Sequence, residues 1–179
     1  THEQNLILPH VEKRYTFKIW EELKKIGLST PNIGLISDII CCPGMDYCAL
    51  ATARSIPISQ KISSVYEEYK TQKFIGNLKI KISGCINACG HHHVGNIGIL
   101  GLDRNGEESY QITLGGSATE NSTIGQIVGP SFSENELLNA LKKIIKTYEK
   151  NRSKDSEDFL TVFKRIGIHE FKKDLYGSS

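Results

Sequence analysis

The chain has 179 residues, of which 39% are hydrophobic and 23% are charged, as in an ordinary globular protein. Its formal net charge of +2 is too small to argue for nucleic-acid binding by itself. No apolar run reaches membrane-spanning length, and the first residues lack the pattern of a signal peptide. The default expectation is therefore a cytoplasmic protein.

The N-terminal part predicts one strand and one helix. Residues 5–9 form a short apolar run that a proline closes, which is typical of a strand. Residues 16–26 carry apolar side chains at helical spacing. Gly27 is placed to end this helix in a left-handed cap, and turn-forming residues follow at 29–34.

The start of the chain suggests that it continues something larger. The first apolar run follows the N-terminus at once, and the only Met is Met45. We therefore expect a fragment of a longer protein. In this interpretation, residues 1–30 are the end of one domain and residues 31–179 form the next.

Two predicted strands lead directly into pairs of cysteines. Residues 35–41 are apolar and β-branched, and residues 79–83 alternate between lysine and isoleucine. Between them we expect a short helix at 46–54, which carries Cys48 on its first turn, and a longer helix from about 58 to 73.

The second half of the chain predicts a hairpin and further helices. Strands are expected at 94–102 and 109–114, because Asn105-Gly106 is a strong hairpin turn signal between them. Another short strand is expected at 124–128.

The clearest helix begins at Ser133, which forms a capping box with Glu136, and runs to about residue 151. Two short helices are expected at 158–166 and 169–175. Together the elements predict an α+β fold, in which helices pack on one face of an antiparallel or mixed sheet.

The five cysteines are the main chemical signal in the sequence. Cys42 and Cys48 form a C-x5-C pair, and Cys85 and Cys89 form a C-x3-C pair on what we expect to be one turn of helix. Clustered cysteines in a cytoplasmic chain indicate metal binding or catalysis more than disulfides. We expect Cys41 to be a buried small residue beside the site and not a ligand.

Thiolates bind soft metals, so zinc and iron–sulfur clusters are the metal candidates. Structural zinc sites usually have two to four residues between paired cysteines, and the first pair here is more widely spaced. A wide loop with Pro43-Gly44 can enclose a cubane cluster. Gly44, Gly84 and Gly90 would let backbone N–H groups reach its sulfides. Spacing therefore favours a 4Fe–4S cluster over zinc.

A cysteine nucleophile is the other option. His91, His92 and His93 follow Cys89 closely, so a Cys–His pair is conceivable. Three adjacent histidines point in different directions, however, and at most one could serve. A polar loop in which none of them is a ligand is the favoured interpretation.

These motifs resemble the sirohaem-binding signature of nitrite and sulfite reductases. The residues that carry the resemblance are Cys42-Pro43-Gly44, Tyr47-Cys48, Leu50-Ala51 and Ser83-Gly84-Cys85-Ile86-Asn87-Ala88-Cys89-Gly90. The similarity continues to Leu114-Gly115-Gly116 and covers about residues 5–175. The chain looks most like the C-terminal half of an assimilatory sulfite reductase haemoprotein subunit.

The resemblance implies a 4Fe–4S cluster bound by Cys42, Cys48, Cys85 and Cys89. It implies that Cys89 also bridges the cluster to the sirohaem iron, and it places Asn87 near the sirohaem. The implied reaction is the six-electron reduction of sulfite to sulfide or of nitrite to ammonia. We assign no catalytic residue, because the basic groups that hold the substrate are expected outside this chain.

The resemblance also implies a domain division and partners. Residues 1–30 would end a ferredoxin-like segment, and residues 31–179 would bind sirohaem and the cluster. The expected partners are the N-terminal half of the reductase, a flavoprotein or ferredoxin electron donor, and a small anion substrate. We expect the isolated fragment to be inactive. Either cofactor can be absent from it. The alternative is a non-catalytic four-cysteine module that holds zinc or an iron–sulfur cluster for structure or electron transfer.

Overall fold

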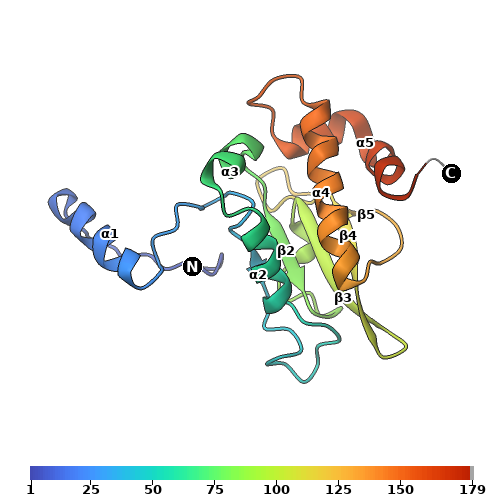
Figure 1. Ribbon diagram of the computed structural model, residues 1–179, viewed down its shortest axis with the longest axis horizontal. Coiled ribbons are helices and arrows are strands. Elements are labelled where there is room, and N and C mark those ends of the chain that lie inside the picture. The colour runs from blue at the N-terminus through green and yellow to red at the C-terminus, as the bar shows by residue number, and fades with distance from the viewer. Residues whose placement is uncertain (178–179) are drawn as a thin grey trace.

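The computed structural model describes residues 1–177, which contain a five-stranded mixed sheet in the order β1-β2-β3-β4-β5 (Figure 1). The first three strands are parallel, namely β1 (Ile40–Cys41), β2 (Ile80–Ser83) and β3 (Ile97–Arg104). Strands β4 (Glu107–Leu114) and β5 (Gln126–Ile127) each run antiparallel to the strand before them. The mixed sheet confirms the predicted fold class.

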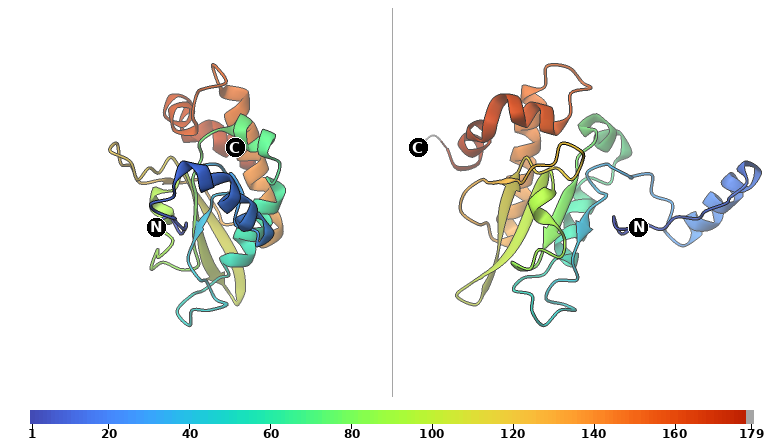
Figure 2. Two further views of the ribbon diagram at one scale, coloured as in Figure 1. Left: turned by 90° about the vertical axis from the view of Figure 1, so that its left-hand side faces the viewer. Right: turned by 180° about the vertical axis from the view of Figure 1, so that it is seen from behind.

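The helices lie on one face of this sheet. Helices α2 (Ile56–Val65) and α4 (Glu134–Asn151) cross the face seen in Figure 1. Helices α3 (Tyr69–Ile75) and α5 (Phe159–Tyr176) pack at one end. The view from behind shows loops over the opposite face, where the short 3-10 helix η2 (His92–Val94) also packs on β3 (Figure 2). Among residues 1–177, none of the helices has both the length and the apolar character needed to cross a membrane.

The core forms between the sheet and α4. The predicted capping box is present, because Ser133 and Glu136 satisfy each other's backbone groups at the start of α4. The Tyr148 side chain on this helix is fully buried, and its hydroxyl lies 2.9 Å from the carbonyl oxygen of Ile75 and 2.8 Å from that of Glu157. The two short helices expected after it are one element, α5, interrupted at Gly167 by a left-handed φ of 73°.

Three local predictions are wrong. Residues 46–54 form turns instead of a helix, because the amides of Thr52 and Ala53 donate to Gly84 in the other cysteine loop. The expected helix at 58–73 is two helices, since Glu68 adopts an extended conformation. The expected strand at 5–9 has no neighbouring strand to pair with in residues 1–177.

The expected strand at 35–41 is shorter than predicted. Only Ile40 and Cys41 pair with β2, whereas residues 35–38 make turns. Asp38 explains the difference, because its carboxylate accepts the amide of Gly34 at 2.8 Å and the ammonium of Lys79 at 3.0 Å. These bonds hold the segment in a turn.

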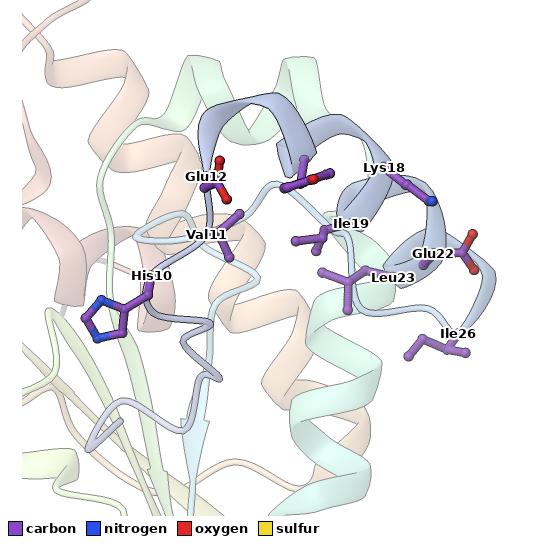
Figure 3. A pocket seen from close by; sticks show the side chains of 9 residues that line it. His10, Val11, Glu12, Lys18, Ile19, Glu22, Leu23 and Ile26 are labelled. Carbon is purple, nitrogen blue, oxygen red and sulfur yellow. The ribbon is translucent and has the colours of Figure 1, made fainter.

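The N-terminal segment stands away from this core. Helix α1 (Thr16–Lys25) begins and ends close to prediction, and Gly27 has the expected left-handed φ of 74°. It has no buried residue, and Figures 1 and 2 show it extending from the sheet. An apolar groove of about 680 Å³ runs along its inner side (Figure 3). Its apolar lining residues are Val11, Tyr15, Ile19, Leu23 and Ile26.

Candidate metal centre

The two cysteine loops begin side by side. Cys42 follows β1 and Cys85 follows β2, and these strands are parallel neighbours with Cys41 opposite Ile82. Because parallel strands deliver their carboxyl ends to the same edge of a sheet, the loops that follow them start at one place. The strand pairing therefore brings together cysteines that are 43 positions apart, at 42 and 85.

Hydrogen bonds join the two loops into one unit. The carbonyl of Gly84 accepts the amides of Thr52 and Ala53 at 2.9 and 3.0 Å. In return, the Gly84 amide donates to Cys42 Sγ at 3.0 Å. The Cys42 amide donates to the carbonyl of Ile82 at 3.1 Å. Cys42 is thus fixed against the loop that carries the second pair.

The second pair does not lie on a helical turn. Residues 84–91 form turns and bends, and Ala88 and His91 have left-handed φ values of 57° and 54°. Gly90 packs so closely on β2 that a Cβ there would lie 1.8 Å from the carbonyl oxygen of Ile82. The glycine is therefore required by packing between backbone segments. This close return shapes the loop between Cys85 and Cys89.

The backbone amides of the motif glycines donate to different kinds of acceptor. Only that of Gly84 reaches a motif sulfur in residues 1–177. The Gly90 amide donates to Ser83 Oγ at 3.2 Å. The Gly84 amide thus reaches the sulfur of Cys42, whereas contact of glycine amides with cluster sulfides stays a prediction.

The four motif cysteines differ in exposure. Cys42 and Cys85 are buried, Cys48 is half-buried and Cys89 is exposed, and all are free thiols. The neighbouring Cys41 turns toward α2, where its Sγ lies 3.6 Å from Ser59 Oγ, and burial raises the pKa of its thiol. Cys41 and Cys42 therefore make different contacts, the first with α2 and the second with the Gly84 loop.

The candidate metal donors here are the four motif cysteines. Within residues 1–177, no three His, Cys, Asp or Glu side chains gather around one point that could hold a metal ion. A structural zinc needs four donors at about 2.0–2.3 Å from one centre. In a cubane each cysteine binds its own iron, so the sulfurs are spread around a larger body. Four free cysteines on two joined loops can supply one thiolate to each iron of such a cluster.

The histidines do not form a Cys–His pair. His92 is buried against the sheet with Nδ1 lacking a hydrogen-bond partner, while His91 and His93 are exposed. Among residues 1–177, no hydrogen bond joins a cysteine to a histidine. The interpretation as a polar loop is therefore the better one.

The buried His92 predicts a pH dependence. Burial and the nearby His93 lower the pKa of His92 from 6.5 to about 4. Between pH 6.5 and about 4, His92 takes up a proton in the unfolded chain but stays neutral in the folded chain. The free energy of unfolding of the metal-free protein should therefore fall by about 1 to 2 kcal/mol between pH 7 and pH 5.

Urea unfolding at the two pH values measures this loss. The variant His92→Gln should lose much of the pH dependence, because glutamine does not titrate. The exposed His91 provides the control, since His91→Gln should keep it. Equal pH dependence in all three proteins would contradict a neutral, buried His92.

Exposed apolar side chains occur on both loops that carry the outer cysteines. Met45, Tyr47 and Leu50 flank Cys48, and Ile86 lies on the loop of Cys89. The exposed fractions of Tyr47 and Ile86 are both 79%. Exposed apolar patches on otherwise polar surfaces mark binding sites. Tyr47 and Leu50 belong to the sequence motif, but the motif did not predict that they would be exposed on the surface.

Two further residues complete the site. Asn87 is exposed, and its carbonyl oxygen lies 4.0 Å from Cys89 Sγ. Ser55, which sequence reasoning missed, is fully buried with its hydroxyl 3.4 Å from Cys42 Sγ. It lies 13 residues after Cys42, outside any cysteine motif, so no spacing signal could have found it.

Comparison with known proteins decides the family. Residues 35–178 match the family described as nitrite and sulphite reductase 4Fe-4S domain. The chain belongs to this family. The match begins just before β1 and includes all five cysteines, so the loops described above are the cysteine loops of a nitrite and sulphite reductase 4Fe-4S domain.

Curated relatives of this 4Fe-4S domain include two kinds of sulfite reductase. The sulfite reductase (NADPH) hemoprotein beta-component of Bacillus licheniformis is 28% identical over 172 residues, which are 94% of this chain and 29% of that protein. An assimilatory-type sulfite reductase of Nitratidesulfovibrio vulgaris is 26% identical over 86% of this chain and 67% of its own length. The chain thus spans less than a third of the first relative.

Solved structures share the fold of this domain. The Mycobacterium tuberculosis NirA protein superposes with a TM-score of 0.76 at 21% identity, over 90% of this chain and 31% of that one. Dissimilatory sulfite reductase I superposes with a TM-score of 0.73 at 13% identity, over 94% of this chain and 59% of that one. At these identities the superpositions show the fold alone.

Proposed function

We propose that this chain is the C-terminal redox core of a sulfite or nitrite reductase. In this proposal Cys42, Cys48, Cys85 and Cys89 bind a 4Fe–4S cluster, and Cys89 also serves as the bridge to sirohaem. When bound, the two coupled centres would pass six electrons, taken singly from an external donor, to the substrate in the reduction of sulfite to sulfide or of nitrite to ammonia. The reductase would work in the cytoplasm.

The observation that carries this proposal is the junction of the two loops. The Gly84 amide donates to Cys42 Sγ, and the Gly84 carbonyl accepts two amides from the loop that carries Cys48. All four cysteines are therefore supplied by one hydrogen-bonded unit, although 36 residues separate the pairs. A hydrogen bond to a cluster ligand also favours the added negative charge of a reduced cluster.

The outer part of the site supports a large second cofactor. Cys89 is exposed and Asn87 lies beside it, and the exposed side chains of Met45, Tyr47, Leu50 and Ile86 are apolar groups that a macrocycle could contact. These residues would hold the macrocycle and keep water away from it.

Anaerobic reconstitution of the chain with ferrous iron and sulfide tests the proposal. We expect iron and acid-labile sulfide in equal amounts, with the broad visible absorption of a 4Fe–4S cluster. Zinc titration of the metal-free protein tests the four-cysteine module. Tight binding of colourless zinc, together with failure to take up iron and sulfide, would contradict the proposed function.

Substrate and electrons would come from outside this chain. Four of the arginines are already engaged, because Arg14, Arg54 and Arg165 pair with carboxylates and Arg152 donates to the carbonyl of Phe74. We therefore assign no residue that binds the anion. The remaining segment of the reductase and a flavoprotein or ferredoxin donor would supply these functions.

We also propose that residues 1–30 belong to a neighbouring segment of the reductase. Leu6, Phe17 and Ile26 have exposed fractions of 83%, 66% and 67%, and α1 contributes nothing to the core. The groove along α1 would then be covered by that segment (Figure 3). The side chains of Glu3, Gln4 and Asn5 tie the segment to the edge of the sheet.

This division predicts that α1 adds little to the stability of the sheet. The variant Trp20→Ala should change the free energy of unfolding by less than about 0.5 kcal/mol, because Trp20 packs against nothing in the core. Thermal unfolding followed by circular dichroism measures the change. The same truncation at the buried Phe159 is the control and should lower the midpoint clearly. Equal losses in the two variants would show that α1 belongs to the core.

A further inference from the structure

We propose that Ser55 is a positioning residue that sets the reduction potential of the cluster through Cys42. The inference rests on the proposed function, since it needs Cys42 to be a cluster ligand. Its basis is a buried hydroxyl–sulfur contact of 3.4 Å between Ser55 Oγ and Cys42 Sγ. Hydrogen bonds to ligand sulfurs raise the potential of iron–sulfur clusters, because they stabilise the more negative reduced state.

The direction of the hydrogen bond follows from the chemistry of the ligand. In the free protein either the thiol or the hydroxyl can be the donor. A thiolate bound to iron has no proton, so the hydroxyl of Ser55 must then donate. Cys42 would accept two hydrogen bonds, one from Ser55 and one from the Gly84 amide at 3.0 Å.

The position of Ser55 leaves its hydroxyl available for this role. Ser55 is the N-cap residue of α2, yet its side chain makes no capping hydrogen bond. The second residue of the helix is Pro57, which has no N–H to donate to a cap. The Ser55 backbone is also helical (φ −114°, ψ −46°) instead of extended as in a typical capping residue, and its hydroxyl lies against Cys42.

Packing holds the hydroxyl in place. Ser55 is 0% exposed and lies between two glycines, since a Cβ built on Gly44 or on Gly84 would come within 2.9 Å of Ser55 Oγ. A hydrogen bond in such buried surroundings is stronger electrostatically than one in water. The absence of a side chain on both glycines thus leaves room for Ser55 between the two cysteine loops.

Cys42 is distinguished from the other motif cysteines by these donors. Within residues 1–177, no hydrogen bond reaches the sulfur of Cys48 or Cys85, and the Cys89 thiol is itself a donor, 4.0 Å from the carbonyl of Asn87. The stabilisation of added charge is therefore concentrated on one buried ligand. Removal of one of its two donors should have a measurable effect on the potential.

The test compares Ser55→Ala with the unaltered chain after anaerobic reconstitution. A redox titration followed by electron paramagnetic resonance measures the potential. We expect the equilibrium constant for reduction to fall about tenfold, which is about 59 mV for one electron. Ser59→Ala is the matched control, because Ser59 Oγ lies 3.6 Å from Cys41, the cysteine outside the ligand set. The reduction potential of the cluster in Ser59→Ala should equal that of the unaltered chain.

A second variant and a second measurement separate the hydrogen bond from packing. Ser55→Thr keeps the hydroxyl and should keep the potential. In the unaltered protein in D₂O, electron–nuclear double resonance should detect an exchangeable hydroxyl deuteron near the cluster in addition to the amide deuteron of Gly84. An unchanged potential in Ser55→Ala, an equal shift in Ser55→Thr, or a missing hydroxyl deuteron would overturn the role of Ser55. Tight zinc binding by the unaltered chain, with no uptake of iron and sulfide, would overturn the proposed function as well.

Discussion

The variants Cys85→Ser and Cys48→Ser are each expected to abolish assembly of the 4Fe–4S cluster. A cubane held at four corners loses one ligand, and a serine oxygen is a poor partner for an iron–sulfur centre, which prefers soft thiolates. Iron and acid-labile sulfide after anaerobic reconstitution should fall to background. Circular dichroism should still show a folded protein, since serine is similar in size to cysteine.

The control is Cys41→Ser, which should retain the cluster. Cys41 faces α2 and Ser59, whereas Cys42 is fixed against Gly84. If Cys41→Ser removes the cluster and Cys42→Ser does not, the ligand assignment is shifted by one residue. If none of the serine variants lowers the iron content, the iron is bound elsewhere.

The variant Gly90→Ala is expected to destabilise the protein by about 3 kcal/mol or more and to reduce cluster content. The added Cβ would lie 1.8 Å from the carbonyl oxygen of Ile82 and 3.1 Å from the Cys42 amide. That carbonyl cannot move aside freely, because it accepts the Cys42 amide at 3.1 Å. The clash therefore acts on both cysteine loops at once. Urea unfolding of the metal-free protein and iron analysis measure the two effects.

A second glycine provides the comparison. Gly27 has open space around its Cα but a left-handed φ of 74°, so Gly27→Ala should cost only the backbone strain of about 1–2 kcal/mol. The effect should also stay local, because Gly27 follows α1, which has no buried residue. A Gly90→Ala protein as stable as Gly27→Ala would show that the loop does not pack on β2 in this way.

The sequence by itself determined the chemistry and the larger elements. Thiolate ligands at a distinctive spacing carry their own metal preference, so the spacing of the four cysteines was enough to indicate a cluster. The hairpin of β3 and β4 and helix α4 were also predicted, because the Asn-Gly turn and the capping box are local signals. Local signals of this kind depend only on neighbouring residues.

Only the tertiary structure decided how the cysteine loops are built. Residues 46–54 and 84–91 were both expected to include helical turns, and both are irregular, because their amides bond between the loops or with β2. The short β1 and the broken helix after it likewise follow from bonds between distant residues, such as that of Asp38 with Lys79. Ser55 shows the same limit, since it reaches Cys42 only after β1 and β2 have paired and the two loops have closed on each other. A contact made across 13 residues of irregular chain has no period or motif in the sequence, so its geometry comes from the packing of the whole fold.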